Sequence, residues 1–201
     1  MNSFRYEDRQ WPKTDAKEYI FSLIRPESYI LDLGCWTGRL GEKLRLEKKC
    51  EIVGVDINQE ALSLAKKRLN YVFQLDLDQP EFLKKVLKEK FDYIVLADVL
   101  EHLKDPKSLL ELTKNFLKDN GFLLVSIPNV ANWTVRWSLL LGKFDYGETG
   151  ILDKTHLRFY TRKSGRELIE SAGYTIFGSY FTGTNFFPTL KAVQFIFVCK
   201  K

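Results

Sequence analysis

From Tyr29 onward, short apolar runs alternate with longer segments whose apolar residues recur at helical spacing. This alternation is typical of a parallel sheet whose strands are joined by crossover helices. It predicts strands at about 29–33, 51–56, 71–75, 91–97 and 121–127, and two closing strands near 174–180 and 191–199. We therefore expect an α/β fold with a doubly wound, mostly parallel sheet of about seven strands, the last one antiparallel. Helices should cover both faces of that sheet.

Helix-start and turn signals fall between the predicted strands. Pro80 and Pro106 stand where helices begin, and Asp105 is a suitable N-cap. Asn120 and Gly121 predict a turn into the strand at 121–127. An amphipathic helix at about 14–24 is expected to cover the sheet edge or the ligand, and the last helix is expected at 162–172.

Composition limits the class of protein. The 201 residues are 45% hydrophobic, which suits a single domain over 1–201 with a sizeable core. No apolar run is long enough to span a membrane, and the first residues lack the apolar stretch of a secretory signal. Cys35, Cys50 and Cys199 lack zinc-site spacing and predict a reducing, cytoplasmic location.

The net charge of +5 raises the question of nucleic-acid binding. The lysines, however, alternate with apolar and acidic residues, as in the segment 84–90. Such alternation is typical of a solvated helix face, so nucleic acid is not the expected partner.

A glycine-containing loop follows the first predicted strand. Gly34 and Gly38 lie between that strand and a helix, where glycine permits tight turns and close approach of the backbone to a ligand. The second strand ends at Asp56, whose carboxylate is suited to a ribose diol. Taken singly, the glycines could only form a turn and Asp56 could only cap a helix; together they favour a nucleotide site. Trp36 stands where a nicotinamide-binding GxGxxG loop would place its middle glycine, which disfavours an oxidoreductase.

Four motifs make the chain resemble the class I S-adenosylmethionine-dependent methyltransferases, which have a Rossmann-like fold. They are Leu31-Asp32-Leu33-Gly34-Cys35-x-Thr37-Gly38, Gly54-Val55-Asp56, Gln74-Leu75-Asp76-Leu77 and the segment 91–103. The resemblance implies that Gly34 and Gly38 pass the methionine part of the cofactor, Asp56 holds the ribose and Asp76 meets the adenine. The full implied cofactor set is Asp32, Gly34, Cys35, Thr37, Gly38, Asp56, Ile57, Asp76, Leu77, Ala97 and Asp98.

Candidate catalytic residues follow the strand at 91–97. Glu101 and His102 should face the crevice at the carboxyl end of the sheet, and His156 lies in a polar and aromatic stretch that should return there. Methyl transfer mainly needs alignment, and a base helps when the nucleophile is a hydroxyl. His102 or His156 could be that base, or each could only hold its loop in place.

A metal site is a further hypothesis. Asp98, Glu101, His102 and His156 form a ligand set suited to magnesium, manganese or iron. The spacing is similar to the Glu-x-x-Glu-His plus His site of small-RNA 2′-O-methyltransferases, with Asp98 in place of the first glutamate. We expect no metal in the basic assignment and retain a divalent ion as an alternative.

The leading functional hypothesis is O-methylation of a small hydroxylated acceptor. The stretches 126–133 and 153–161 resemble bacterial methyltransferases of cell-surface polysaccharide pathways, which implies a sugar or glycan precursor. The alternatives are a metal-assisted RNA 2′-O-methyltransferase, whose RNA binding would depend steeply on salt, and a non-catalytic protein that retains the fold.

The segment 129–160 is expected to form an inserted cover over the acceptor pocket. Its apolar residues at helical spacing should be buried against something: Trp133, Trp137, Leu140, Leu141 and Phe144. The alternatives are fixed packing on the core, or contact of the two tryptophans with a membrane surface beside Arg136 and Lys143.

Overall fold

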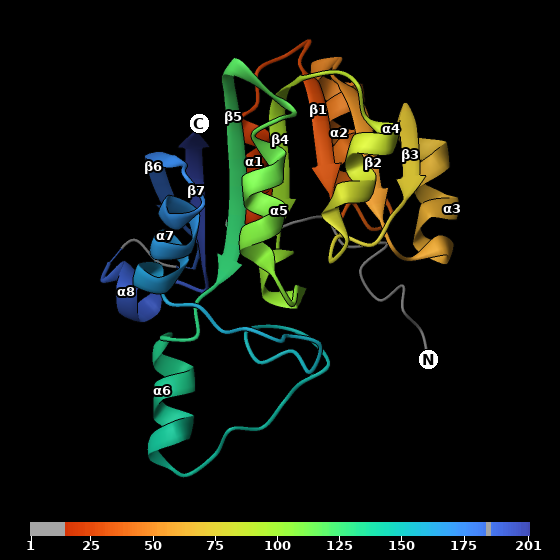
Figure 1. The fold of residues 1–201 in the computed structure, drawn as a ribbon. Coiled ribbons are helices and arrows are strands. Elements are labelled where there is room, and N and C mark those ends of the chain that lie inside the picture. The colour runs from red at the N-terminus through yellow and green to blue at the C-terminus, as the bar shows by residue number, and fades with distance from the viewer. Residues whose placement is uncertain (1–14, 184–185) are drawn as a thin grey trace.

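The computed structural model describes residues 15–183 and 186–201, so the N-terminal residues considered above lie outside the described part. Its centre is a seven-stranded sheet in the order β3-β2-β1-β4-β5-β7-β6 (Figure 1). The strands are β1 (Tyr29–Leu33), β2 (Glu51–Asp56), β3 (Tyr71–Gln74), β4 (Phe91–Ala97), β5 (Leu117–Pro128), β6 (Thr175–Phe181) and β7 (Gln194–Lys200). Only β7 runs antiparallel to its neighbours β5 and β6, which confirms the predicted α/β sheet.

Helices cover both faces of the sheet, as expected. One face carries α1 (Ala16–Leu23), α2 (Arg39–Lys48) and α3 (Gln59–Arg68), whose apolar side chains form a single cluster with the sheet. The other face carries α4 (Leu83–Val86), α5 (Pro106–Thr113) and α7 (Arg162–Ser171). Four short helices complete the described chain: η1 (Pro80–Phe82), η2 (Leu100–His102), α6 (Trp133–Leu140) and α8 (Pro188–Lys191).

Alternation along each strand explains why the sheet needs both layers. In β1, Leu31 and Leu33 pack toward α5, whereas Ile30 packs toward α1. The helix starts also follow local chemistry, since Asp105 caps α5 by accepting a hydrogen bond from the Ser108 N–H at 3.2 Å.

Two expectations about the elements were wrong. Gly121 does not form a turn, because β5 already begins at Leu117 and runs through it. A Cβ at Gly121 would lie 3.0 Å from the carbonyl oxygen of Asp92, so glycine here permits close approach of β5 to β4. Helix α1 covers the middle of one sheet face rather than an edge, since Ile20 shares a core cluster with Leu124 of β5 and Ile196 of β7.

The order of the strands determines where a ligand can bind. Connections from β1 and β4 lead to opposite sides of the sheet, and the crevice outside the carboxyl ends of such strands is the usual ligand site. The segment 129–160 follows β5 at this same end and extends away from the sheet, at the bottom of the view in Figure 1. Within the described part of the chain, no helix is both long and apolar enough to cross a membrane.

Candidate active site

The loop between β1 and α2 turns tightly at the carboxyl end of β1. Gly34, Trp36 and Gly38 all have positive φ angles, of 77°, 50° and 79°. The Gly34 N–H donates to the carbonyl of Val55 at 2.7 Å, which ties the loop to β2. A Cβ at Gly34 would lie 2.5 Å from Cγ2 of Val99, so glycine allows this loop to contact the segment after β4. The two loops therefore meet at the switch point between β1 and β4.

Asp56 at the end of β2 is held by the backbone. Its carboxylate accepts hydrogen bonds from the N–H groups of Trp36 at 2.8 Å and Asn58 at 2.9 Å. Asn58, and not Asp56, caps α3 by accepting from the Ala61 N–H. The capping alternative for Asp56 is therefore wrong, and each of its oxygens keeps a lone pair for a further donor.

The residue after Asp56 is unusual for its exposure. Ile57 is 61% exposed, although it follows a buried strand directly. An apolar side chain beside a fixed carboxylate offers a surface for a base next to an acceptor for a ribose hydroxyl. This pairing fits an adenosine group.

Three expected cofactor residues, one in β1 and two in the loop itself, have buried side chains. Asp32 and Thr37 are buried, and burial raises the pKa of Asp32 to about 7, with Lys17 opposing this shift and Asp56 adding to it. Cys35 is also buried, and burial raises its thiol pKa, so this thiol is not a reactive nucleophile.

Asp76 and Leu77 follow β3. The Asp76 carboxylate accepts from the N–H of Asp78 at 2.9 Å and from the side chain of Gln79 at 3.2 Å. The Leu77 side chain packs in the core, which leaves only its backbone for contact with a ligand.

Asp98 follows the half-buried Ala97 at the end of β4 and has a left-handed φ of 58°. Its carboxylate accepts from the Ser126 hydroxyl at 2.7 Å and from the Gln194 amide at 2.8 and 2.7 Å. Ser126 belongs to β5 and Gln194 to β7. Two neighbouring strands therefore hold this carboxylate in place and keep it turned toward the sheet.

Glu101, His102 and His156 come together at the same end of the sheet. Their potential ligand atoms all lie within 4.8 Å of one another. Glu101 is 1% exposed, and burial, with Asp98 adding to the effect, raises the pKa of its carboxyl well above the usual range. His156 Nε2 is 4.0 Å from Glu101 Oε1, and burial lowers the pKa of this imidazole.

Hydrogen bonds determine the tautomers of both imidazoles. Nδ1 of His156 faces the carbonyl of Ile151 at 3.1 Å. Nδ1 of His102 faces the carbonyl and the hydroxyl of Thr155, each at 3.2 Å, and that hydroxyl already donates to Asp153. Because these partners can only accept, Nδ1 carries the proton in both rings, and each neutral ring has its lone pair on Nε2.

The loop that carries His156 is attached to η2. The N–H groups of Leu157 and Arg158 donate to the backbone carbonyl of Glu101 at 2.8 and 3.0 Å. The Arg158 guanidinium also binds the carbonyls of Leu103 and Lys104. These bonds bring residues more than fifty positions apart into one cluster.

The chain matches the family model described as "Methyltransferase domain" over residues 4–177. This chain belongs to the methyltransferase domain family. The family assignment gives S-adenosylmethionine as the cofactor. Two solved structures with this fold, both of magnesium protoporphyrin IX methyltransferase from Synechocystis, hold S-adenosylhomocysteine and S-adenosylmethionine.

Curated relatives include ubiquinone biosynthesis O-methyltransferases. The one from Glaesserella parasuis is 34% identical over 108 residues, covering 50% of this chain and 45% of its own. The one from Azoarcus is 27% identical over 160 residues, covering 73% and 67%. The chain spans about half the length of the first such relatives it matches.

Solved structures share the fold. A SAM-dependent methyltransferase from Archaeoglobus fulgidus has a TM-score of 0.67 at 20% identity, covering 92% of this chain and 90% of its own. One from Clostridium acetobutylicum has a TM-score of 0.66 at 19% identity, covering 96% and 93%. None of these matches names a polysaccharide pathway.

The methyltransferase therefore gathers most of the residues expected from sequence at one end of its sheet. Asp98 is the exception within the metal hypothesis, because it does not belong to the cluster of Glu101, His102 and His156. Sequence reasoning missed Gln194 altogether, since a glutamine at the start of an apolar strand gives no sign of a partner 96 positions away. The roles of Thr155 and Asp153 were also missed, although they flank His156 in the sequence.

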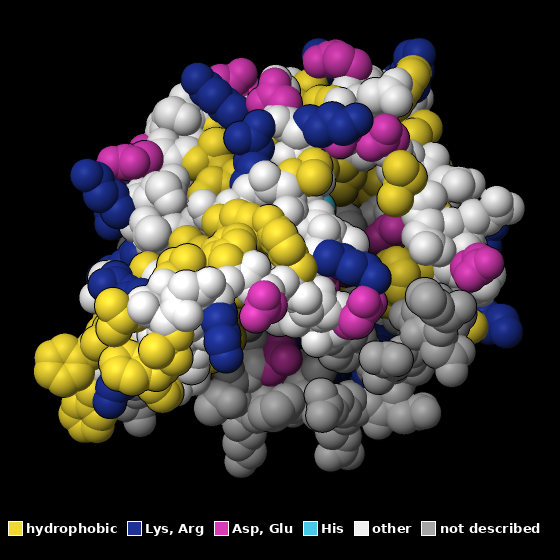
Figure 2. Space-filling view, turned by 90° about the horizontal axis from the view of Figure 1, so that it is seen from below, with side chains coloured by type: hydrophobic (Ala, Val, Ile, Leu, Met, Phe, Trp, Pro, Cys, Tyr) yellow, Lys and Arg dark blue, Asp and Glu magenta, His cyan; other side chains and the backbone are white. Residues whose placement is uncertain are grey.

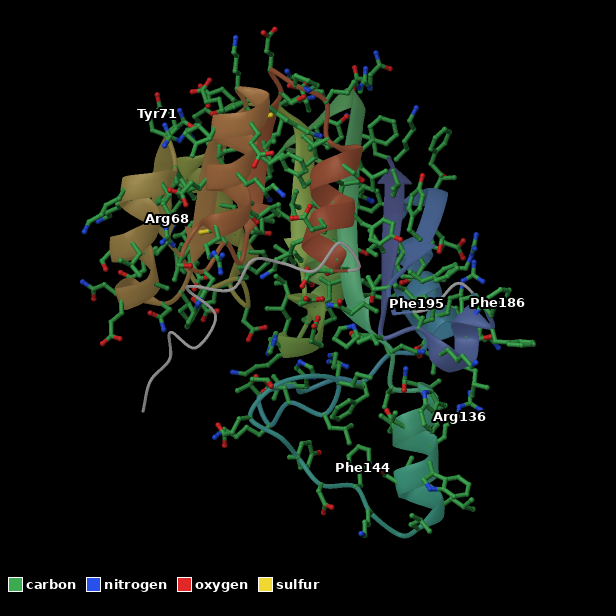
Figure 3. The ribbon with its side chains drawn as sticks, turned by 180° about the vertical axis from the view of Figure 1, so that it is seen from behind. Arg68, Tyr71, Arg136, Phe144, Phe186 and Phe195 are labelled. Atoms are coloured by element: carbon green, nitrogen blue, oxygen red, sulfur yellow. The ribbon has the colours of Figure 1, made fainter. Side chains whose placement is uncertain are left out.

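The apolar stripe of 129–160 differs from expectation. Trp133 and Trp137 are 53% and 58% exposed, so the stripe is not buried and fixed packing on the core is wrong for it. Helix α6 ends at Leu140, and Phe144 lies in the loop beyond it. Figure 2 shows hydrophobic side chains gathered on a protruding part of this face, and Figure 3 places Arg136 and Phe144 on the segment below the sheet.

Proposed function

We propose that this methyltransferase methylates a hydroxyl oxygen of a small acceptor bound beside Glu101, His102 and His156. The observation that carries the proposal is the pair of imidazoles that lie beside one buried carboxyl group, each with Nδ1 facing an acceptor and so with its lone pair left on Nε2. An imidazole with a free lone pair can accept the proton of an acceptor hydroxyl as its oxygen is methylated.

On the cofactor side, Asp56 and Ile57 hold the adenosine, and the loop at Gly34 to Gly38 lies beside the methionine part. When bound, S-adenosylmethionine supplies a methyl group that passes to the acceptor oxygen as its carbon–sulfur bond breaks, leaving a neutral thioether. The contribution of the chain is to align the acceptor oxygen and to receive the hydroxyl proton at an imidazole Nε2.

Aromatic side chains next to His156 favour a ring-shaped acceptor. Phe159 is 6.1 Å from His156 between ring centroids, and Phe144 and Tyr146 pack edge-on or tilted against Phe159. These rings suit either an aromatic ring or the apolar face of a sugar. The names of the relatives direct attention to a ubiquinone-type acceptor, and the sugar acceptor expected from sequence remains the second class to be tested.

Transfer of a labelled methyl group to a panel of phenolic and sugar acceptors tests this proposal. We expect label on an oxygen of one class, detected by mass spectrometry of the product. Label on nitrogen or carbon, or transfer only to RNA, would contradict it.

We also propose that 129–160 covers the acceptor pocket within the single domain. The exposed stripe of α6 supports this, because an apolar surface at the ligand end of the sheet has no covering neighbour and a bound acceptor could supply one. Hydrogen exchange should show 129–160 protected by cofactor and acceptor together more than by either alone. Equal strong protection without ligand would contradict the cover, and co-sedimentation with anionic vesicles would favour the membrane alternative.

A further inference from the structure

Glu101 has an unexplained buried carboxyl group. Both of its side-chain oxygens are buried without a hydrogen-bond partner among the described residues. The cost of leaving such a group unpaired in the interior is on the order of several kcal/mol for a charge, so native proteins rarely tolerate it. His156 Nε2 lies 4.0 Å from Glu101 Oε1, which is too far for a hydrogen bond.

Two imidazoles are already oriented as metal ligands around that carboxyl. A metal-binding histidine usually donates its other ring N–H to a carbonyl or carboxylate, which fixes the tautomer and the orientation of the ring. His102 and His156 both do so, through Thr155 and Ile151, and Asp153 in turn accepts from Thr155. The rings lie 4.8 Å apart between centroids and nearly perpendicular, at 71°.

We infer that Glu101, His102 and His156 bind one divalent transition-metal ion through a carboxylate oxygen and the two Nε2 atoms. Ligand bonds of about 2.0 to 2.2 Å place neighbouring ligand atoms about 3 to 3.6 Å apart. The three ligand atoms, which now lie within 4.8 Å of one another, would therefore draw together by roughly 1 Å around an ion. The ion would supply the positive charge that the Glu101 carboxylate lacks, and three protein ligands would leave positions open for an acceptor oxygen.

The ligand chemistry selects among ions. Two imidazole nitrogens and one carboxylate suit zinc, iron, cobalt or manganese, whereas magnesium prefers oxygen ligands and retains its waters. Asp98 does not join the set, because its carboxylate is turned toward Ser126 and Gln194 and lies outside the cluster of the three ligands. The inferred site therefore differs from the four-residue, magnesium-compatible site expected from sequence.

This inference rests on the proposed function for the acceptor hydroxyl and replaces its imidazole base with a bound ion. A bound ion would acidify and orient the acceptor hydroxyl, whose proton would then pass to solvent while the imidazoles remain ligands. Ion binding itself rests only on the geometry of the three side chains, so it can be measured without any acceptor.

The test is titration of the chelator-stripped, full-length chain with Co²⁺, followed by visible absorption and by calorimetry. We expect one site per chain, and Glu101→Gln, His102→Ala and His156→Ala should each weaken Co²⁺ binding by at least about tenfold. Magnesium in large excess should not displace Co²⁺. Glu148→Gln is the matched control, because Glu148 is an exposed carboxylate of the same loop, paired with Lys154.

Variants that fail to fold are identified from their circular dichroism. For those that fold, a rise in the melting temperature on adding Zn²⁺ should appear in the parent chain and in Glu148→Gln but not in Glu101→Gln. Absence of a one-to-one site, equal binding by the ligand variants, or displacement by equimolar Mg²⁺ would overturn the inference.

If no ion binds and the histidine variants still lose turnover, the proposed function survives with the imidazoles as bases. If an ion binds but no hydroxyl is methylated, only the proposed function fails.

Discussion

At the ligand end of the sheet, the proposed cofactor side and the proposed acceptor side differ in how their polar groups are satisfied. On the cofactor side, Asp56 receives two backbone N–H groups and Asp76 receives one, so these carboxylates have partners without a ligand. On the acceptor side, Glu101 is buried without a hydrogen-bond partner in the described structure, and Trp137 is 58% exposed. The cofactor side is thus preorganised by its own backbone, whereas the acceptor side leaves both polar and apolar groups for a partner to complete.

The difference explains which mutations should affect chemistry and which should affect binding. A carboxylate already held by N–H groups contributes mainly to affinity, since its position does not change during the reaction. Side chains whose lone pairs face the acceptor contribute mainly to turnover.

The largest effect is expected from the imidazoles. His102→Ala and His156→Ala should each lower turnover by about 10² to 10⁴ while leaving affinity for S-adenosylmethionine nearly unchanged. Single-turnover kinetics and calorimetry measure the two quantities separately. Normal turnover in both variants would show that neither imidazole takes part in proton transfer, and the contrast between the two sides would be lost.

Asp56→Ala should have the next largest effect. It removes a charged acceptor from the ribose, so affinity for S-adenosylmethionine should fall by about 1.5 to 3 kcal/mol. Calorimetry checks this, with Asp78→Ala as a carboxylate control from the loop after β3. An unchanged dissociation constant would remove Asp56 from the cofactor site.

The pH dependence of cofactor binding tests Asp32. Burial raises its pKa from 3.8 to about 7, so the stability it contributes is full below about 4 and is lost as the pH rises through 7. Because the methionine part of the cofactor carries positive charge, its binding should favour ionised Asp32. Below pH 7, the affinity for the cofactor should therefore increase by up to about tenfold for each unit that the pH rises. Calorimetry from pH 5.5 to 8 should show this slope in the parent chain and not in Asp32→Asn. A flat profile in the parent would place the cationic group elsewhere.

The smallest effect concerns stability on the acceptor side. Trp137→Ala should change the free energy of unfolding by no more than about 0.5 kcal/mol, because the ring is largely exposed. Val135→Ala, on the buried side of the same helix, should cost about 1 to 2 kcal/mol. Urea denaturation compares the two, and a large loss in Trp137→Ala would mean that the stripe is already packed in solution.

Sequence reasoning located correctly the features that depend on the local backbone. The strand at 29–33, the loop with Gly34 and Gly38 and the carboxylate of Asp56 are all defined by short-range patterns, and the structure places them together. It failed where partners come from distant strands. The restraint of Asp98 by Gln194 and the burial of Glu101 depend on tertiary packing, which periodicity does not report. The exposed stripe of α6 was misjudged because periodicity shows that a face is apolar, not that a neighbour covers it.

The bond between Gln194 and Asp98 has a consequence for the order of folding. Asp98 adopts a left-handed φ of 58°, a conformation that non-glycine residues adopt at a cost, and its carboxylate is held by a residue 96 positions further along. Asp98 therefore gains its full set of hydrogen-bond donors only once β7 has paired with β5. A partly folded chain could therefore complete the β1–β3 half of the sheet, which carries the proposed nucleotide site, while the half with the proposed reacting groups is still unassembled. The protein would then acquire the ability to bind its cofactor before it acquires the ability to use it.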